Sequence, residues 1–297
     1  MKTLAIVTPT YNRANLLHIA YQSLEKQTSK DFVWYIVDDG SSDNTQQVVA
    51  DIIDKASFKV IYHKKKNGGK HSALNSAYSL LNEELTIILD SDDELTNNAV
   101  EIILNDYNSI KDDKTICGLG YLKLNKSNNN ETVGKPYTQD SIIDTFTNQR
   151  INNNTWGDKC EVFKSEILKQ YPFPEFEGEN FVSESVVWCK MSLDYKMKFM
   201  NKGVYICDYQ TGGLSDGVHK RLFNNPKGAS ACYLSMSSKQ VKLKYRIKYT
   251  IAYTVYSLAA KIKLKQQFKQ ISSKFIYMIT FMPSWFIYLR KKRRYKK

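Results

Sequence analysis

Three carboxylates stand directly behind an apolar run. The segment Leu-Thr-Ile-Ile-Leu-Asp-Ser-Asp-Asp-Glu (85–94) places Asp90, Asp92 and Asp93 within four positions. Alternate residues of an extended segment point the same way, so Asp90 and Asp92 project to one face. Two such carboxylates supply the oxygen ligands that Mg²⁺ and Mn²⁺ prefer. An isolated D-x-D is more often an acidic turn after a strand, so this interpretation depends on the neighbouring segments.

The surrounding segments predict the elements that position these acids. We expect strands over 4–8, 32–37, 58–62 and 85–89. Asn12 can cap a helix over about 14–27, and Ser41, Ser42 or Asp43 can cap a second helix to about residue 54. A third helix is expected over 70–81. Apolar strands separated by helices indicate a parallel α/β sheet covered on both faces, whose ligands gather at the carboxyl ends of the strands.

Polar clusters follow all four predicted strands. They are Thr-Pro-Thr-Tyr-Asn-Arg at 8–13, Asp-Asp-Gly-Ser-Ser-Asp at 38–43, Asn-Gly-Gly-Lys-His-Ser-Ala-Leu-Asn at 67–75, and the acids at 90–93. The third cluster is a glycine turn that leads into a helix N-terminus. Because the carboxyl ends of parallel strands meet at one edge, we expect these clusters to form one site.

In this order and spacing, the clusters resemble those of the inverting family-2 glycosyltransferases of the GT-A fold. Residues 173–184 (Phe-Pro-Glu-Phe-Glu-Gly-Glu-Asn-Phe-Val-Ser-Glu), 205–209 (Tyr-Ile-Cys-Asp-Tyr) and 213–215 (Gly-Leu-Ser) resemble a bacterial cell-surface polysaccharide branch. The resemblance implies a Rossmann-like, mostly parallel central sheet with helices on both faces. We expect a GT-A domain over 1–235, with a nucleotide-binding half (1–100) and an acceptor-binding half (101–235), followed by a helical tail over 236–297.

The resemblance also implies a nucleoside pocket for a nucleoside-diphosphate sugar, and the uridine-type donors of the family lead us to expect a UDP-sugar. Thr8, Pro9 and Tyr11 would line the pocket, with Tyr11 stacked on the base. Asp39 would accept a hydrogen bond from the base imide N–H, and Asp38 would support the turn. Taken singly, Tyr11 could equally be a core aromatic residue and Asp39 a helix N-cap.

By the same resemblance, Asp92 would hold Mn²⁺ or Mg²⁺, and the ion would act as a Lewis acid on the departing diphosphate. Asp90 would contact the ribose or the water shell of the metal, and Ser91 belongs to the same nucleotide-binding set. Asp93 is expected to cap the helix that begins near residue 97, and the alternative is that it supports the metal-binding carboxylates from behind.

Three cationic side chains are candidates for the diphosphate. Lys70 stands where a helix N-terminus also favours an anion, although an ordinary solvated lysine is equally consistent with the sequence. Arg13 and His71 are weaker candidates for the same role.

The acceptor side needs one carboxylate base, because inverting transfer is a single in-line displacement. Many family members have Glu-Asp at this helix start, with the Asp as base, whereas this chain has Ser185 at the Asp position. Glu184 is therefore the predicted base, with Glu179 and Glu177 as alternatives. Glu184 could instead only favour the helix dipole. Trp156 and Glu179 are predicted acceptor contacts, although Trp156 could equally be a core residue.

The net charge of +13 is concentrated at one end of the chain. Of the 43 Lys and Arg residues, 17 lie from Lys239 onward, and no Asp or Glu follows Asp216. The preceding residues hold 26 basic against 30 acidic side chains. A nucleic-acid-binding protein would spread its basic residues over the folded body, so no nucleic-acid partner is expected.

This basic tail contains an aromatic, apolar run at 275–289 that is followed at once by Arg-Lys-Lys-Arg-Arg-Tyr-Lys-Lys. The run is too short to span a bilayer comfortably and contains Pro283, which favours a helix lying at an anionic membrane surface. A lipid-linked or glycan acceptor would follow. The alternative is a helix pair packed on the catalytic domain or on a second subunit, as in a homo-oligomer.

The location predicted from the sequence is cytoplasmic and peripheral to the inner face of the cell membrane. Met1 leads directly into a strand without the apolar segment of a secretory signal. The five cysteines form no C-x-x-C pair, and we expect reduced core thiols.

Two other functions compete with transfer of a single sugar. A sugar nucleotidyltransferase would normally show a glycine-rich loop after the first strand, which residues 8–13 lack. A non-catalytic membrane-bound adaptor would keep the fold but lose the base, for which Ser185 is the argument. The Q-x-x-R-W motif of processive synthases does not occur in the sequence, which favours one sugar per encounter.

Overall fold

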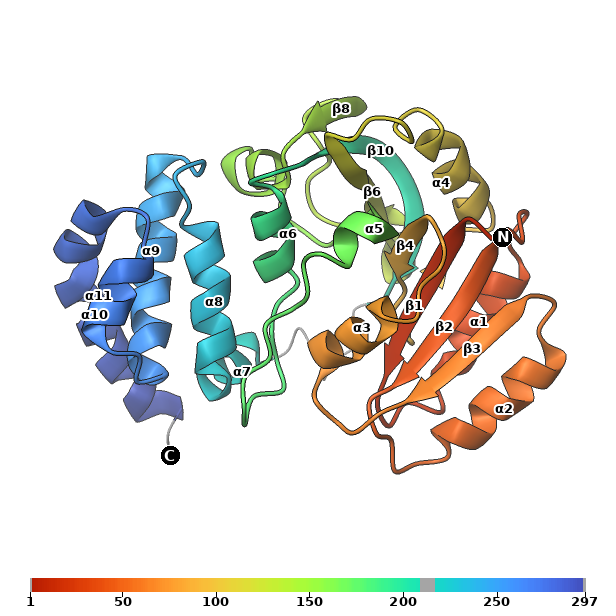
Figure 1. Cartoon of the computed structure of the whole chain (residues 1–297), viewed down its shortest axis with the longest axis horizontal. Helices are drawn as coiled ribbons and strands as arrows, with labels where there is room; N and C mark the ends of the chain where they lie inside the picture. The colour runs from red at the N-terminus through yellow and green to blue at the C-terminus, as the bar shows by residue number, and fades with distance from the viewer. Residues whose placement is uncertain (1, 209–216, 296–297) are drawn as a thin grey trace. The chain divides into compact units, whose positions relative to one another are not determined.

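The computed structural model describes residues 2–208 and 217–295 (Figure 1). The chain divides into two compact units, which are described separately. Unit 1 comprises Met1–Thr145, Thr155–Pro172 and Asp194–Gln210, and unit 2 comprises Phe146–Asn154, Phe173–Leu193 and Thr211–Lys297. This is a division by compactness, so the functional division predicted after residue 235 stays a prediction.

Unit 1 is built on one mixed sheet. In the described residues its main path runs β3-β2-β1-β4-β9-β6-β10-β5, with β7 paired to β6 and β8 to β10. The strands are β1 Leu4–Thr10, β2 Phe32–Asp38, β3 Lys59–Lys64, β4 Leu85–Ile88, β5 Glu94–Leu95, β6 Ile116–Asn125, β7 Glu131–Thr132, β8 Ser141–Asp144, β9 Lys159–Lys164 and β10 Lys196–Cys207. Strands β1, β2, β3 and β4 pair in parallel with one another, whereas β9 is antiparallel to both β4 and β6. The predicted parallel α/β sheet is confirmed for this half.

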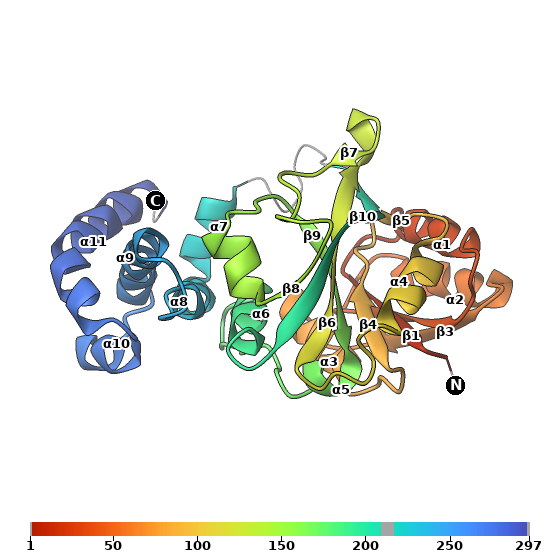
Figure 2. The same ribbon diagram turned by 90° about the horizontal axis from the view of Figure 1, so that it is seen from above.

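Helices cover both faces of the parallel strands, as Figure 2 shows. The helices of unit 1 are α1 Leu17–Glu25, α2 Thr45–Lys55, α3 Lys70–Tyr78, α4 Ala99–Tyr107 and α5 Ser165–Leu168, with a 3₁₀ turn at Lys126–Asn128. Leu4, Ile6 and Trp34 pack in one core with the buried residues of α1 and α2. Tyr21 of α1 stacks on Trp34 with 6.5 Å between ring centroids. Helix α3 contacts β1 and β2, with Leu74 buried.

Two capping predictions were wrong. The first helix begins at Leu17, and Asn12, with φ 50°, lies in the left-handed region. Its side-chain oxygen accepts from the Ser42 N–H at 2.8 Å, so Asn12 ties the first strand end to the second. The fourth helix begins at Ala99, whereas Asp93 bonds elsewhere, as described below. In both places a tertiary hydrogen bond replaces the local one that the sequence suggested.

Unit 2 is helical. Its elements are a π-helical turn at Asn148–Asn152 and helices α6 Ser185–Met191, α7 Val218–Asn224, α8 Pro226–Met236, α9 Leu243–Ala259, α10 Leu264–Gln270 and α11 Lys274–Tyr295. Helix α9 packs against both α8 and α11. Tyr256 of α9 is buried beside Phe223 and Ala229, and Tyr253 is buried beside Ile271 and Tyr277. The predicted tail therefore forms three helices that are part of a larger helical layer.

Two further observations concern the whole described chain. All five cysteines are buried free thiols, as predicted. In the described residues, none of the helices combines the length and apolar character that crossing a bilayer requires.

Candidate functional site

Asp39 holds the glycine turn against the end of β2. Its carboxylate accepts from the backbone N–H groups of Gly68 at 2.9 Å and Gly69 at 2.6 Å, and from the Lys65 ammonium at 3.0 Å. Gly69 has φ 91°, a conformation that strongly favours glycine, and it leads directly into α3. The Asp39 side chain is therefore fixed at the sheet edge and is not a helix N-cap; its contact with a nucleobase stays a prediction.

Asp38 supports the same turn from inside. It is fully buried, and its carboxylate accepts from the Ser41 N–H at 2.7 Å and from the Tyr62 hydroxyl at 2.6 Å. Burial raises the pKa of Tyr62, and the hydrogen bond to Asp38 raises it further. Both bonds fix the backbone between β2 and α2, in agreement with the supporting role that the sequence predicted for Asp38.

Residues 90–93 form a turn after β4, closed by a bond of 3.1 Å from the Asp93 N–H to the Asp90 carbonyl, so the extended segment predicted for Asp90 and Asp92 was wrong. We call these residues the acidic turn. Asp90 and Asp92 nevertheless each face a cation from another strand end. The Arg13 guanidinium lies 2.8 Å from the Asp92 carboxylate, and the Lys70 ammonium lies 2.7 Å from the Asp90 carboxylate. All four side chains are about one third exposed. Residues far apart in sequence thus meet at the carboxyl edge of β1 and β4 and at the start of α3. Lys70 is accordingly not an ordinary solvated lysine.

The Asp93 side chain is directed into the protein and does not cap α4. Its carboxylate accepts from the Tyr205 hydroxyl at 2.7 Å and lies 3.8 Å from the Lys123 ammonium. The same Tyr205 hydroxyl accepts from the Asp90 N–H at 3.0 Å. The Lys123 ammonium also lies 3.8 Å from the Tyr205 ring centroid. Tyr205 therefore fixes the backbone of the acidic turn from β10.

The neighbouring acids Asp90 and Asp93 differ in protonation. Burial alone would raise the pKa of Asp90, but the charges of Lys70, Lys123 and Arg13 outweigh it and hold this pKa below its ordinary value. Burial raises the pKa of Asp93 to about 7, and the charge of Asp90 adds to the effect. Asp90 is therefore ionised near neutral pH, whereas Asp93 titrates there.

The remaining nucleoside-pocket candidates have different surroundings. Tyr11 is 48% exposed at the end of β1, which excludes a core role and leaves its ring available for stacking. Thr8 is fully buried, and its hydroxyl accepts from the Trp34 indole N–H at 2.8 Å. Pro9 is half-buried and Ser91 is buried. The nucleotide contacts of all four stay predictions.

The acidic turn fits a divalent ion only if further oxygens are supplied. Asp90 and Asp92 offer partly exposed carboxylate oxygens of the kind that Mg²⁺ and Mn²⁺ prefer. Within residues 2–208 and 217–295, no group of three His, Cys, Asp or Glu side chains gathers as a protein-only metal site. A diphosphate carries the missing oxygens, so the residues fit an ion that binds together with one.

Of the three acids predicted on the acceptor side, Glu177 is exposed, whereas Glu179 and Glu184 of unit 2 are each next to a helix start but bond differently. Both Glu179 carboxylate oxygens accept at 2.8 Å, from the N–H groups of Lys227 and Gly228 at the start of α8. Glu184 precedes the first residue of α6, and among the described residues its side chain makes no capping hydrogen bond to that helix. Burial raises the pKa of the Cys232 thiol, and the charge of the nearby Glu184 raises it further. Their acceptor roles stay predictions.

Trp156 belongs to unit 1 and is not a core residue. Its side chain is 62% exposed, so the core-packing alternative was wrong. Its backbone is fixed, because the Trp156 carbonyl accepts from the Lys135 N–H at 3.0 Å and from the Lys159 ammonium at 3.3 Å. An exposed indole on a fixed backbone can stack on a sugar ring.

Three residues of the site were not assigned from the sequence. Lys65 bonds to Asp39, while Lys123 and Tyr205 hold the acidic turn. A lysine inside the apolar strand β6 was a usable signal for Lys123, since an unpaired buried charge is costly. Tyr205 stood in a segment that carried the family resemblance. Of the other predicted positions, His71 is buried, and residues 209 and 213–215 lie outside the described residues.

The sequence model of the family described as "Glycosyl transferase family 2" matches residues 5–167, more than half of the chain. This range contains the glycine turn, the acidic turn, and the Arg13 and Lys70 side chains that pair with Asp92 and Asp90. The chain therefore belongs to glycosyltransferase family 2, which confirms the resemblance and favours a glycosyltransferase over a sugar nucleotidyltransferase.

Two curated relatives extend beyond that range. Glycosyltransferase GlyG of Streptococcus pneumoniae serotype 4 is 25% identical over 226 residues, covering 71% of this chain and 72% of the relative. The GalNAc(5)-diNAcBac-PP-undecaprenol beta-1,3-glucosyltransferase of Campylobacter jejuni is 29% identical over 205 residues, covering 67% of this chain. The matched segment spans 61% of the length of that second relative.

Solved structures show the same fold at low identity. Residues 1–349 of S. aureus TarS in complex with UDP-GlcNAc align with a TM-score of 0.64 at 17% identity, covering 97% of this chain and 81% of that one. The Pyrobaculum calidifontis mannosyltransferase PcManGT in complex with GDP-Man and Mn²⁺ aligns with a TM-score of 0.57 at 15% identity, covering 99% and 87%. The GT-A fold prediction is confirmed.

Proposed function

We propose that this chain transfers a single sugar from a UDP-sugar to a hydroxyl of a glycan or lipid-linked acceptor, with inversion and with a divalent ion, in cell-surface polysaccharide synthesis. One observation carries the proposal. The two alternating carboxylates of the acidic turn are paired with Arg13 and Lys70, which come from two other strand ends. A site with both signs of charge suits a ligand that brings a cation and an anion together, as a metal-bound diphosphate does.

The relatives support the choice of donor and acceptor. The TarS structure contains UDP-GlcNAc, and the PcManGT structure contains GDP-Man and Mn²⁺. The Campylobacter relative is named for a substrate with a sugar chain on undecaprenyl diphosphate. A UDP-sugar donor, a divalent ion and a lipid-linked acceptor are the corresponding proposals for this chain.

The donor would be held by side chains of unit 1. Tyr11 stacks on the base, and Asp39 accepts from the base N–H while its other bonds hold the glycine turn. Lys70 and Arg13 leave their acid partners and bind diphosphate oxygens, helped by the N-terminus of α3. Asp92, freed from Arg13, is the residue that would hold a divalent ion. When bound, this ion supplies Lewis-acid stabilisation of the leaving diphosphate.

The transfer step needs one base. Glu184 takes the proton of the acceptor hydroxyl while that oxygen forms a bond to the anomeric carbon. The bond from the anomeric carbon to the diphosphate oxygen breaks on the opposite side, and its electron pair leaves with UDP. Attack opposite the leaving group inverts the anomeric configuration. Trp156 and Glu179 are the proposed acceptor contacts.

The proposed location is cytoplasmic, at the inner face of the cell membrane, where a lipid-linked acceptor would be found. The proposed functional domains are those predicted from the sequence, with donor binding in 1–100, acceptor binding in 101–235 and membrane association in 236–297. The tail helices α9 to α11 carry an excess of basic residues without any acid.

A panel of UDP-sugars and GDP-sugars tests the proposal on the full chain. UDP release in the presence of Mn²⁺ is expected with at least one UDP-sugar, to stop with EDTA, and to return with excess Mn²⁺. Asp92→Ala is expected to lower this release at least about a hundredfold. Asp54→Ala changes an exposed acid of α2 and serves as the matched control. With an acceptor, NMR should show the opposite anomeric configuration in the product.

Each other outcome points to a defined alternative. Donor binding by calorimetry without release or transfer under any condition would favour the non-catalytic adaptor. Equal UDP release by Asp92→Ala and the unaltered chain would exclude the proposed metal site. A product of retained configuration would exclude Glu184 as the single base of an in-line displacement.

A further inference from the structure

Helix α11 has an apolar face that is not covered in the described structure. On its other side α11 packs against α9, with Tyr277 beside Tyr253 of that helix, and Ile276, Tyr277, Thr280 and Ser284 are buried. The uncovered residues recur at helical spacing, and each is at least 39% exposed. They are Phe275, Met278, Ile279, Met282, Trp285 and Phe286. We call this set the α11 stripe. Six large apolar side chains exposed side by side on one helix face indicate a binding surface.

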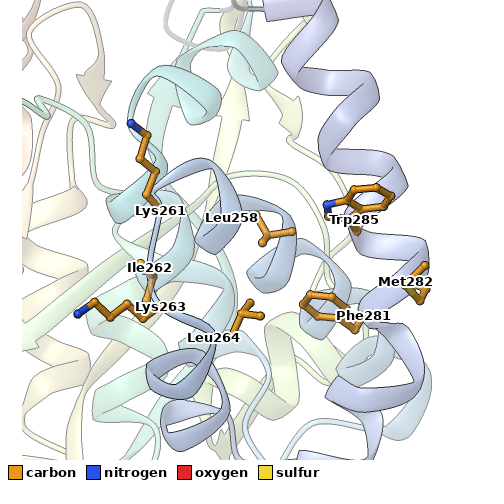
Figure 3. Close-up of a pocket in the computed structure, with 8 residues that line it drawn as sticks. All are labelled: Leu258, Lys261, Ile262, Lys263, Leu264, Phe281, Met282 and Trp285. Atoms are coloured by element: carbon orange, nitrogen blue, oxygen red, sulfur yellow. The ribbon is translucent and has the colours of Figure 1, made fainter.

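The stripe continues into an apolar groove of about 470 Å³ beside the turn between α9 and α10. Figure 3 shows Leu258, Ile262 and Leu264 on one side of the groove and Phe281 and Trp285 of α11 on the other. Met282 and Trp285 belong to both the stripe and the groove lining. The two features therefore form one apolar surface of unit 2.

Cations border this surface. Lys261 and Lys263 line the groove, and in Figure 3 their ammonium groups extend away from its apolar side chains. Lys265 and Lys269 are exposed on α10, and exposed Arg290, Lys292, Arg293 and Arg294 follow the stripe on α11. From residue 217 to the last residue, the sequence contains no acid. Long basic side chains at the edge of an apolar surface suit the boundary between lipid chains and anionic headgroups.

A second copy of the chain is a poorer occupant than a lipid bilayer. Two copies packed through this surface would bring together two tails that each carry 17 Lys and Arg residues and no acid. Like charges at an interface oppose association, whereas an anionic leaflet attracts them. Charge complementarity therefore selects the membrane.

From the stripe, the groove and their basic border we infer that α11 lies in the surface of an anionic phospholipid bilayer, with the α11 stripe buried among the lipid chains and Lys261 and Lys263 at the headgroups. The groove receives the end of a lipid chain beside Trp285. This inference deepens the proposed membrane association by naming the face that binds. Its tests measure vesicle binding, which is independent of sugar transfer.

Flotation with vesicles tests the inference on the full chain. The chain is expected to float with phosphatidylglycerol–phosphatidylcholine vesicles and to bind phosphatidylcholine vesicles at least about tenfold more weakly. Ile279→Glu should lower binding to the anionic vesicles at least about tenfold, because it places a charge in the apolar stripe. Ile143→Glu is the matched control, since Ile143 of β8 is 51% exposed and Ile279 is 57% exposed. The control is expected to bind as the unaltered chain does.

A double substitution tests the basic border of the groove in the same assay. Lys261→Gln with Lys263→Gln should weaken binding about tenfold, since each cation near an anionic surface contributes about a fivefold effect at most. Lys55→Gln with Lys59→Gln removes two exposed lysines of unit 1 and should have no effect. UDP release measured without vesicles reports on the donor site alone, so a loss there concerns the proposed function and not this surface.

A spectroscopic measurement avoids dependence on one variant. Vesicles with brominated lipid chains should quench part of the tryptophan fluorescence, and Trp285→Phe should abolish that part. The inference is overturned if the chain does not bind anionic vesicles, if Ile279→Glu binds as tightly as Ile143→Glu, or if quenching persists in Trp285→Phe. It is also overturned if light scattering without lipid shows a dimer that Ile279→Glu dissociates, because a second copy would then cover the stripe.

Discussion

The acids of unit 1 and unit 2 are bonded in different ways. At the sheet edge of unit 1, Asp90 and Asp92 pair with the side-chain cations of Lys70 and Arg13. In unit 2, Glu179 bonds to two backbone N–H groups at the start of α8. The basic side chains of the tail have no acid near them in sequence.

This difference separates a binding site from a structural contact. A partly exposed ion pair contributes little net stability. Each of its members can therefore leave its partner and bind a ligand with little loss of stability. A carboxylate bonded to two helix N–H groups satisfies donors that otherwise have no partner in the helix, so it stays in place. We therefore expect substitutions at the ion pairs to change turnover, and substitution of Glu179 to change stability.

Glu184→Gln is expected to have the largest effect, because Glu184 is an acid of unit 2 for which a catalytic role is proposed. Loss of a general base lowers a rate by about 10²–10⁴-fold. Transfer to the acceptor should fall by this amount, while the dissociation constant of the UDP-sugar, measured by calorimetry, stays unchanged.

The matched control for Glu184 is Glu166→Gln. Glu166 is an exposed acid in the first turn of α5, so it tests whether an acid at a helix start matters for the helix dipole alone. If both variants transfer sugar as well as the unaltered chain, Glu184 only stabilises the helix dipole of α6. The acids of unit 2 that were tested would then all be structural.

Lys70→Gln ranks second. The Lys70 ammonium pairs with Asp90 at 2.7 Å and is proposed to move to the diphosphate. A hydrogen bond to a charged group contributes about 1.5–3 kcal/mol, so kcat/KM for the donor should fall about 10–100-fold. Lys66→Gln, at an exposed lysine of the preceding turn, should leave kcat/KM unchanged. A variant with unaltered kcat/KM would show that the ion pair with Asp90 is only structural.

Tyr205→Phe sharpens the description of the sheet edge. The Tyr205 hydroxyl joins the Asp90 N–H to the Asp93 carboxylate, and its removal leaves both groups without this partner. The free energy of unfolding in urea should fall by about 1–3 kcal/mol. Tyr195→Phe removes a hydroxyl from a half-buried tyrosine of the same unit and should cost less. Equal losses would mean that Tyr205 does not fix the acidic turn.

Local sequence patterns predicted the sheet and the edge at which the site forms. The apolar runs before Thr8, Asp38 and Asp90 became parallel strands, because each run is buried on both faces and ends in polar residues. The order of the strand ends then brought Lys70 and Arg13 to the acids. The family resemblance supplied the assignment of these residues to a nucleotide-sugar site.

What the sequence did not predict depends on contacts between distant residues. Asn12 and Asp93 looked like helix caps, but Asn12 bonds to Ser42 and Asp93 bonds to Tyr205, which is 112 positions away. Local capping preference is worth only about 1 kcal/mol, so a tertiary hydrogen bond can override it. The sequence also did not predict the uncovered face of α11, because the apolar run does not show which side of the helix α9 covers.

Glu179→Ala is expected to have the smallest effect, and it tests the structural side of the comparison. The Glu179 carboxylate accepts from Lys227 and Gly228 at the start of α8, so removing it should cost about 0.5–2 kcal/mol of unfolding free energy. Glu177→Ala, at an exposed acid of the same segment, should leave stability unchanged. The proposed acceptor contact of Glu179 predicts in addition that KM for the acceptor rises in Glu179→Ala and not in Glu177→Ala. A raised KM without any loss of stability would reverse the assignment, because an acid bonded to a helix start would then act as a binding residue.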